Sequence, residues 1–177
     1  MQINGMRDPL SLHATAVALR NREPHMVSIR PLQRNDHEDW LRLWRGYQEF
    51  YRVEIPEATS AVVFERLLDP AEPMNGALAL RDGRVVGLVH HIRHRSCWTV
   101  GDYCYLQDLF VDREVRGGGV GRALIDYVYQ VAAAQQCSRV YWLTHESNAE
   151  AMVLYNRVAD RSGFVQYRKI LTPPGKS

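Results

Sequence analysis

The most informative segment of the chain is a run of glycine and arginine that follows an apolar stretch and opens a helical pattern. It reads Arg-Gly-Gly-Gly-Val-Gly-Arg from Arg116 to Arg122. A helix N-terminus leaves backbone N–H groups unpaired and carries a partial positive charge. Glycines let an anion approach those N–H groups, and an arginine adds a full charge with forked donors. The segment is therefore typical of a loop that binds a pyrophosphate.

The spacing of the glycines excludes two common phosphate-binding loops. A Walker loop ends in Gly-Lys-Ser/Thr, but Gly121 is followed by Arg122. A dinucleotide fingerprint, Gly-x-Gly-x-x-Gly, also fails, because its third glycine would fall on Arg122 or on Leu124. The pattern present is Arg-x-x-Gly-x-Gly, at Arg116, Gly119 and Gly121. For this loop taken alone, an ordinary glycine-rich turn is the alternative.

A second motif lies downstream of the loop. It carries Asn148, then Leu154-Tyr155, and then Gly163-Phe164. The two motifs, in this order and at this distance, resemble the GNAT family of N-acetyltransferases. The resemblance runs from Met26 to the C-terminus, and within the family it is strongest to the histone and polyamine acetyltransferases of fungi and their bacterial relatives.

The resemblance implies an enzyme that transfers the acetyl group of acetyl-CoA to a primary amine by direct attack. The acceptor would be a small amine, a polyamine, an amino acid, or a protein lysine or N-terminus. A regulatory module that binds coenzyme A without turnover is the alternative from another class. A nucleotide-hydrolysing enzyme is disfavoured because the loop lacks a P-loop lysine.

The resemblance also implies which residues bind the cosubstrate. The backbone of Leu109, Phe110 and Val111 would pair with the pantetheine, although a plain core strand explains these residues equally well. Asn148 would contact the pantetheine arm; its alternative role is a helix cap. The residues expected around the pyrophosphate are Arg116, Gly117, Gly118, Gly119, Val120, Gly121 and Arg122.

Tyr155 resembles the general acid of the family. A phenol, with a pKa of about 10, can hydrogen-bond the departing thiolate and give it a proton. The alternative is a core tyrosine at helical spacing from Met152 and Ala159.

The general base is less clear from the residues. Diamine acetyltransferases have a glutamate where this chain has Gln107, and an amide cannot accept a proton. We therefore expect Gln107 to position a water molecule. Its neighbour Asp108 is expected to point to the opposite face of the strand. Glu146 is a second candidate for the general base; alternatively, it is only a solvated charge in a loop. By its position in the family, the segment from Tyr47 to Glu57 is expected to form a wall of the acceptor site.

Three histidines near one cysteine raise the question of a metal. Alternation along a strand places His90 and His94 on one face, far apart, and His91 on the other. A solvated strand end is the favoured interpretation, and no metal site is predicted.

The elements that must position these residues follow an α/β pattern. The expected order is β-α-α-β-β-β-α-β-α-β, a single-domain GNAT fold with a mixed central sheet and helices on both faces. Val140 to Leu143 is apolar on both faces, which predicts a central strand. Phe164 to Leu171 is expected to form the final strand or two. Residues 1–25 are interpreted as an extension without a core role, and 26–177 as the domain.

Composition sets the remaining expectations. The 177 residues suffice for one domain, and a net charge of +2 is too small to indicate nucleic-acid binding. The three cysteines form no Cys-x-x-Cys pair, which favours a reducing cytoplasm. No apolar run reaches the length of roughly 18 residues that a membrane span needs. A homodimer is expected because dimers are frequent in such folds.

Overall fold

The computed structural model describes residues 26–171, so the expected extension 1–25 lies outside the described residues. This part of the chain forms two short 3₁₀ helices at Arg34–Asp36 and Arg113–Val115, together with five strands and four α-helices. In chain order they are β1 (Val27–Pro31), α1 (His37–Tyr51), α2 (Glu57–Leu68), β2 (Met74–Arg81), β3 (Arg84–His94), β4 (Tyr103–Val111), α3 (Val120–Ala134), β5 (Arg139–Tyr141) and α4 (Ala149–Val158).

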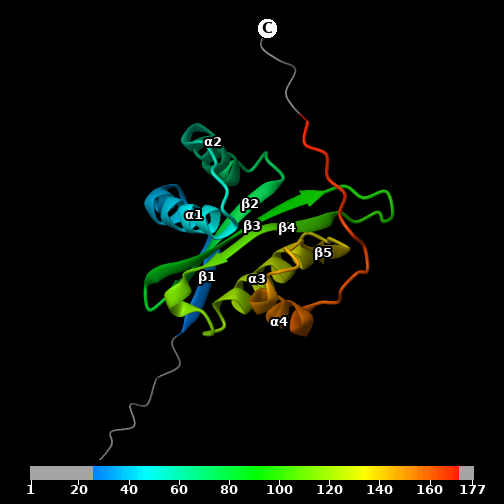
Figure 1. Ribbon diagram of the computed structural model, residues 1–177. Coiled ribbons are helices and arrows are strands. Elements are labelled where there is room, and N and C mark those ends of the chain that lie inside the picture. The colour runs from blue at the N-terminus through cyan, green and yellow to red at the C-terminus, as the bar shows by residue number, and fades with distance from the viewer. Residues whose placement is uncertain (1–25, 172–177) are drawn as a thin grey trace, which may run out of the picture.

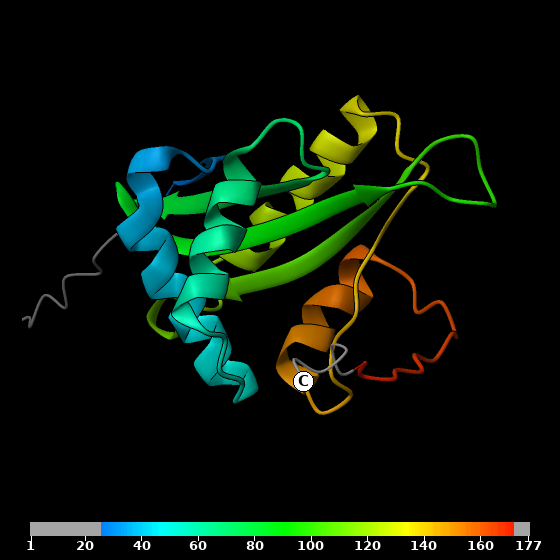
Figure 2. The same cartoon turned by 90° about the horizontal axis from the view of Figure 1, so that it is seen from above.

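The strands form one mixed sheet in the order β1-β2-β3-β4-β5. The first three pairings are antiparallel, and β5 lies parallel to β4. Helices α1 and α2 cover one face of the sheet, and α3 covers the other with α4 beside it (Figures 1 and 2). The expected α/β architecture is therefore confirmed.

Each face of the sheet has its own hydrophobic core. On β3, Leu88 packs toward α1 and α2, whereas its neighbour Val89 packs toward α3, and both are fully buried. This is the alternation that a strand covered on both faces requires. The two cores hold the C-terminal half of β4 rigidly between α1 and α3, which matters because that half of the strand borders the site.

A bulge in β4 breaks the alternation at the position where chemistry was expected. His90 of β3 pairs with Asp108, but the next residue, His91, pairs with Leu106, so Gln107 is an extra residue. Leu106 and Leu109 contribute to the same core although they are three residues apart. In a regular strand they would lie on opposite faces. Gln107 and Asp108 consequently share the face that carries α1, and the expectation that Asp108 points away from Gln107 is wrong.

Two expectations about the C-terminal third are also wrong. β5 spans only Arg139–Tyr141 and lies at the edge of the sheet, not in its centre. Residues 164–171 form no strand, and their apolar side chains are exposed, with 92% of Tyr167 accessible to solvent. The physical reason is that a strand needs a backbone edge to pair with, and the three-residue β5 offers little edge to a segment of this length.

Candidate active site

The site begins where β4 and β5 separate. Their pairing ends at Tyr105 and Tyr141, while β4 continues to Val111. Beyond Tyr105, β4 pairs with β3 on one side only. Apart from the Val111 carbonyl oxygen, which accepts a hydrogen bond from Arg116, the backbone groups on its other edge have no strand partner among the described residues and can pair with an extended ligand.

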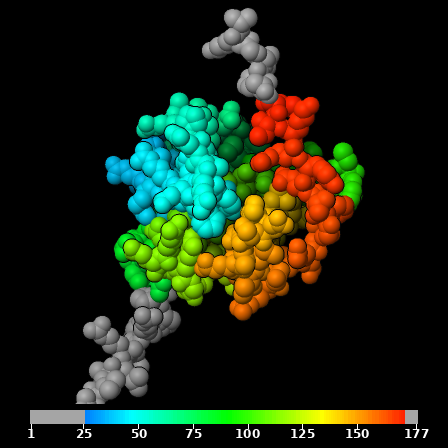
Figure 3. Space-filling model, viewed as in Figure 1, coloured from blue at the N-terminus to red at the C-terminus, as the bar shows by residue number. Residues whose placement is uncertain are grey.

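A cavity of about 420 Å³ opens at this free edge. The end of α1, the loop before α3 and helix α4 meet around it on the face turned to the viewer in Figure 3. Its lining comprises Phe50, Tyr51, Leu109, Phe110, Val111, Val115, Arg116, Gly117, Gly119, Val120, Gly121, Arg122, Asn148, Glu150, Ala151, Val153, Leu154, Tyr155 and Arg157.

Nearly all of the residues expected to bind the cosubstrate line this cavity. The one exception is Gly118; of the two residues expected to be catalytic, Tyr155 lines the cavity and Gln107 does not. A Cβ atom on Gly118 would lie 2.7 Å from Nη1 of Arg81, at the end of a flexible side chain, and 3.2 Å from the Val115 carbonyl oxygen, so this glycine lies close against its neighbours behind the loop. Distant segments are thus brought together as the two motifs predict.

The loop before α3 has the geometry of an anion site. Gly119 is the N-cap residue of α3 and adopts the left-handed conformation, with φ of +80°. Only glycine takes this conformation without strain, and it turns the first N–H groups of α3 toward the cavity end of the helix. A Cβ atom on Gly121 would lie 3.3 Å from Leu154, so this glycine allows α3 and α4 to approach each other.

Arg116 is fixed at the wall of the cavity. Its Nε donates a hydrogen bond to the Val111 carbonyl oxygen at 3.3 Å, and its guanidinium lies 5.5 Å from the centre of the Phe50 ring. Glu150, which is largely exposed, lies 3.7 Å from the guanidinium. A positive group held beside a helix N-terminus favours a bound anion.

Tyr155 lies on α4 at the inner end of the cavity. Its ring packs edge-on against Trp142 with 5.4 Å between the ring centres. Burial, with a smaller contribution from Tyr51, raises the pKa of Tyr155 to about 12. The phenol therefore keeps its proton over the neutral range and is available as a donor. Its ring also packs against the core on the α3 face, and its role as the general acid stays a prediction.

Asn148 occupies the N-cap position of α4, but its side chain does not cap the helix. The amide instead donates to Oγ1 of Thr144 at 3.0 Å, and the residue lines the cavity. The alternative role, in which the Asn148 side chain caps the helix, is therefore wrong. The side-chain oxygen of Asn148 is an acceptor that a ligand amide in the cavity could use.

The groups considered as the base occupy different environments. Gln107 is exposed in the bulge, and Glu146 is exposed in the loop before α4. Asp108 is buried, with 8% of the residue accessible to solvent. Neither Gln107 nor Glu146 lines the cavity.

The histidines of β3 are not a solvated strand end, as the sequence had suggested. His90 and His91 are buried, at 3% and 2% exposure, and only His94 is exposed. Burial lowers the pKa of His91 to about 4, so this ring is neutral. Among residues 26–171, no group of three potential metal ligands comes together.

His90 forms a buried chain of hydrogen bonds that the sequence did not reveal. Nε1 of Trp40 donates to Nε2 of His90 at 2.9 Å, and Nδ1 of His90 contacts Oδ2 of Asp108 at 3.0 Å. Tyr47 lies nearby, since the charge of Asp108 adds to the effect of burial in raising the pKa of this tyrosine. The only sequence signal was a pair of histidines inside an apolar run of β3, which favours buried, partnered rings over solvated ones.

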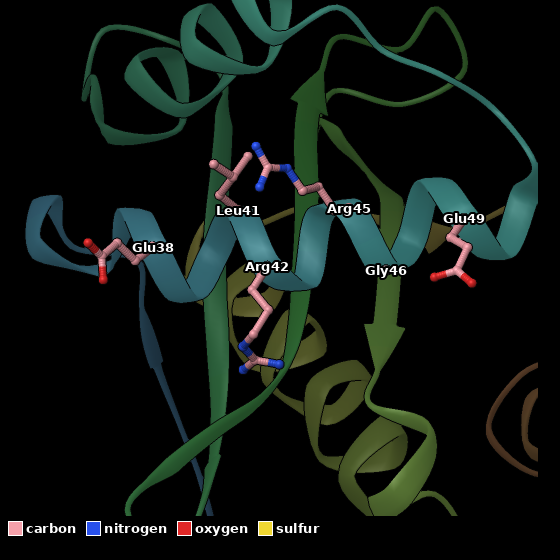
Figure 4. A pocket seen from close by; sticks show the side chains of 6 residues that line it. All are labelled: Glu38, Leu41, Arg42, Arg45, Gly46 and Glu49. Carbon is pink, nitrogen blue, oxygen red and sulfur yellow. The ribbon is translucent and has the colours of Figure 1, made fainter.

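A second hollow, of about 470 Å³, lies along the outer side of α1. Its charged side chains all come from this one helix and point in different directions (Figure 4). Arg42 is already bound to Asp112 at 2.8 Å and to the Val85 carbonyl oxygen at 2.7 Å. No reacting groups converge there, so the cavity at the edge of β4 is the candidate active site.

Comparison with known proteins agrees with this geometry. Residues 40–159 match the model of the acetyltransferase (GNAT) family. The chain is 33% identical over 158 residues to the D-amino-acid N-acetyltransferase HPA3 of Saccharomyces cerevisiae, covering 85% of this chain and 98% of the relative. It is 30% identical to the thialysine N-epsilon-acetyltransferase of Bos taurus, covering 73% of this chain and 81% of the relative. The chain therefore belongs to the GNAT family and is an acetyl-transferring enzyme that acts on an amine.

Solved structures share the fold. The ribosomal-protein-alanine N-acetyltransferase from Brucella melitensis superposes with a TM-score of 0.70 at 21% identity, over 82% of this chain and 100% of its own. An aminoglycoside acetyltransferase from an uncultured soil sample superposes with a TM-score of 0.69 at 20% identity. The match covers 82% of this chain and 97% of the aminoglycoside acetyltransferase. Within residues 26–171, no helix has both the length and the apolar composition needed to cross a membrane.

Proposed function

We propose that the cavity at the edge of β4 binds acetyl-CoA, the cosubstrate of the family. The observation that carries this proposal is that the free edge of β4 leads directly to the glycine-capped N-terminus of α3 within one cavity. The free edge suits the peptide-like pantetheine, and the N–H groups of α3 suit the pyrophosphate. Arg116 and Arg122 supply positive charge at the same end.

In the reaction, the acceptor ammonium first loses a proton. The amine nitrogen then attacks the thioester carbonyl carbon, the C–S bond breaks, and the amide forms with loss of a second proton. Tyr155 gives its phenolic proton to the departing sulfur and is reprotonated from solvent, so that one proton is released overall. We place Gln107 as the residue that orients a water molecule, through which the proton of the amine leaves. Its exposed position in the bulge fits a water-linked role better than a direct one.

The acceptor is a primary amine. The two curated relatives act on D-amino acids and on thialysine, both of which carry a primary amine. Tyr51 lines the cavity, as its position on the expected acceptor wall suggests, whereas Glu54 is exposed in the loop after α1.

Turnover tests the proposal and separates it from a regulatory coenzyme A module. Thiol release from acetyl-CoA should depend on an added primary amine. Gln107→Leu should lower kcat, because the leucine cannot hold water, while Gln107→Glu should retain or raise it. Glu146→Gln is the matched control and should leave kcat unchanged, since Glu146 is an exposed residue of the loop before α4 and not part of the bulge in β4. A leucine variant with an unchanged rate would remove Gln107 from the mechanism, and binding of coenzyme A without any turnover would establish the regulatory role.

We further propose that the protein acts as a homodimer joined through its C-terminal segment. Residues 164–171 carry exposed apolar side chains, and Trp98 of the β3–β4 loop, 72% exposed, contacts Phe164 with 6.5 Å between ring centres. β5 has only one pairing partner among the described strands. A second copy would supply both a backbone edge and an apolar surface for this segment.

Sedimentation tests the dimer. The wild-type chain should sediment as a dimer, and Tyr167→Lys combined with Ile170→Lys should shift it to the monomer, because two charges would enter the interface. Val62→Lys on α2 likewise places a charge at an exposed apolar position, and it should not alter the sedimenting mass. A wild-type monomer at every concentration would contradict the proposal.

A cytoplasmic location stays a prediction, supported by free Cys97, Cys104 and Cys137.

A further inference from the structure

Asp108 is a buried carboxylate without a cationic partner. Its side chain is 9% exposed, and its one ion-pair contact is with His90 at 3.0 Å. Within residues 26–171, no arginine or lysine nitrogen lies within 4.0 Å of it. Buried carboxylates are normally paired with a cation, because the loss of hydration is otherwise uncompensated. The absence of a partner therefore requires an explanation.

The hydrogen bonds around His90 show that this ring does not supply the missing charge. An indole N–H can only donate, so Nε2 of His90, which receives it from Trp40, must carry a lone pair. The ring proton is then on Nδ1, which donates to Oδ2 of Asp108. His90 is thus a neutral donor whose orientation and tautomer are fixed by Trp40, and it fixes Asp108 in turn.

Tyrosines surround the open side of the carboxylate. Burial, and to a lesser extent the nearby charge of Asp108, raises the pKa of Tyr47, so this phenol lies close to the carboxylate. The charge of Asp108 also adds to the effect of burial on the pKa values of Tyr51 and Tyr105. These three side chains are only half-buried, and Tyr51 lines the cofactor cavity. A negative group behind electron-rich rings is a suitable environment for an ammonium group.

The bulge explains why the carboxylate can face this side. Without the extra residue, Asp108 would lie in the core next to α3. With it, Asp108 lies under α1, at the point where β4 and β5 separate. Asp108 does not itself line the cavity, but the next residue, Leu109, and Tyr51 both do.

Resting on the proposed function, we infer that Asp108 binds the ammonium group of the acceptor, and that His90 is the residue that positions it. The acceptor is accordingly an amine that arrives as a cation, and the ammonium completes the ion pair that the folded protein lacks. Tyr47 shares the carboxylate and closes the site from the side of α1.

Steady-state kinetics test the role of Asp108, with benzylamine, putrescine and spermidine as probes. Asp108→Asn keeps the shape of the side chain and removes its charge. The KM of the amine should rise at least about tenfold, in line with loss of a hydrogen bond to a charged group, while the KM of acetyl-CoA stays within about twofold. Asp112→Asn, at the end of the same strand region, is the matched control and should change neither KM.

The outcomes separate this inference from the proposed function. An unchanged amine KM in folded Asp108→Asn, or an equal rise in both KM values, would overturn the inference while leaving the enzyme assignment intact. A wild-type protein that turns over none of the amines would refute the proposed function. Calorimetry of spermidine binding to the coenzyme A complex would then decide the inference, which requires at least about tenfold weaker binding in Asp108→Asn.

The positioning role of His90 has its own test. His90→Leu removes the donor, and the amine KM should rise at least about fivefold with little change in kcat. His90→Gln should restore the KM, because an amide can accept from Trp40 and donate to Asp108. A purely structural histidine predicts a different result: the leucine variant would lose thermal stability with both KM values unchanged, and glutamine would not rescue a kinetic effect.

Discussion

Gly119→Glu should bind coenzyme A at least about 100-fold more weakly than the wild-type protein, as measured by calorimetry. No atom of residues 26–171 lies within 4 Å of a Cβ atom at this position, so the new side chain would occupy the space before the first turn of α3. Its negative charge would compete for the same N–H groups that the pyrophosphate needs. Loss of two hydrogen bonds to a charged group is sufficient for the expected change.

Gly83→Glu is the matched control for backbone strain and charge. Gly83 lies in the turn between β2 and β3, has φ of +78° against +80° for Gly119, and also has no neighbour within 4 Å of a Cβ atom. This variant should lose similar stability yet bind coenzyme A like the wild-type protein. Unchanged affinity in a folded Gly119→Glu protein would exclude the loop as the pyrophosphate site.

Tyr155→Phe should lower kcat at least about tenfold, because general acid–base groups typically contribute about 100- to 10,000-fold. The affinity for coenzyme A should stay near that of the wild-type protein, since the ring and its contact with Trp142 remain. The pKa of Tyr155, near 12, keeps the phenol protonated below that pH, so the wild-type donor remains effective in alkaline assays. The deficit of the variant should shrink at low pH, where solvent protonates the thiolate more readily.

Tyr127→Phe provides the comparison for Tyr155. Tyr127 is a partly buried tyrosine that packs against the same core from α3, and its pKa is likewise raised by burial, but it does not line the cavity. Its phenylalanine variant should turn over at the wild-type rate. If Tyr155→Phe also did so, Tyr155 would be a core residue only.

The parts of the site that follow from local rules were predictable from the sequence. Arg116, Gly119 and Gly121 needed only the rule that glycines precede a helix that binds an anion, and the structure places all three in one cavity wall. The sheet and its covering helices likewise followed from alternating and helical periodicity. Tyr155 was reachable through the family motif, and the structure adds its contact with Trp142 and the physical cause of its raised pKa.

The parts that depend on pairing between distant segments were not predictable. The bulge arises from the pairing register between β4 and β3, and no residue type in β4 predicts it. The chain from Trp40 through His90 to Asp108 joins a helix to two strands, so its members are far apart in sequence. The strand expected at residues 164–171 failed for a similar reason, since apolar content indicates a preference for pairing and does not supply the edge.

The bulge also determines how functional residues can be compared along β4. In a relative whose strand lacked the extra residue, every position before it would exchange faces relative to the positions after it. A position-by-position alignment would then equate a residue in the amine site with one in the α3 core. Assigning roles by column is therefore valid on this strand only among proteins that share the two-against-one pairing opposite His90. The geometry of a single backbone irregularity thus defines which relatives are informative about the acceptor.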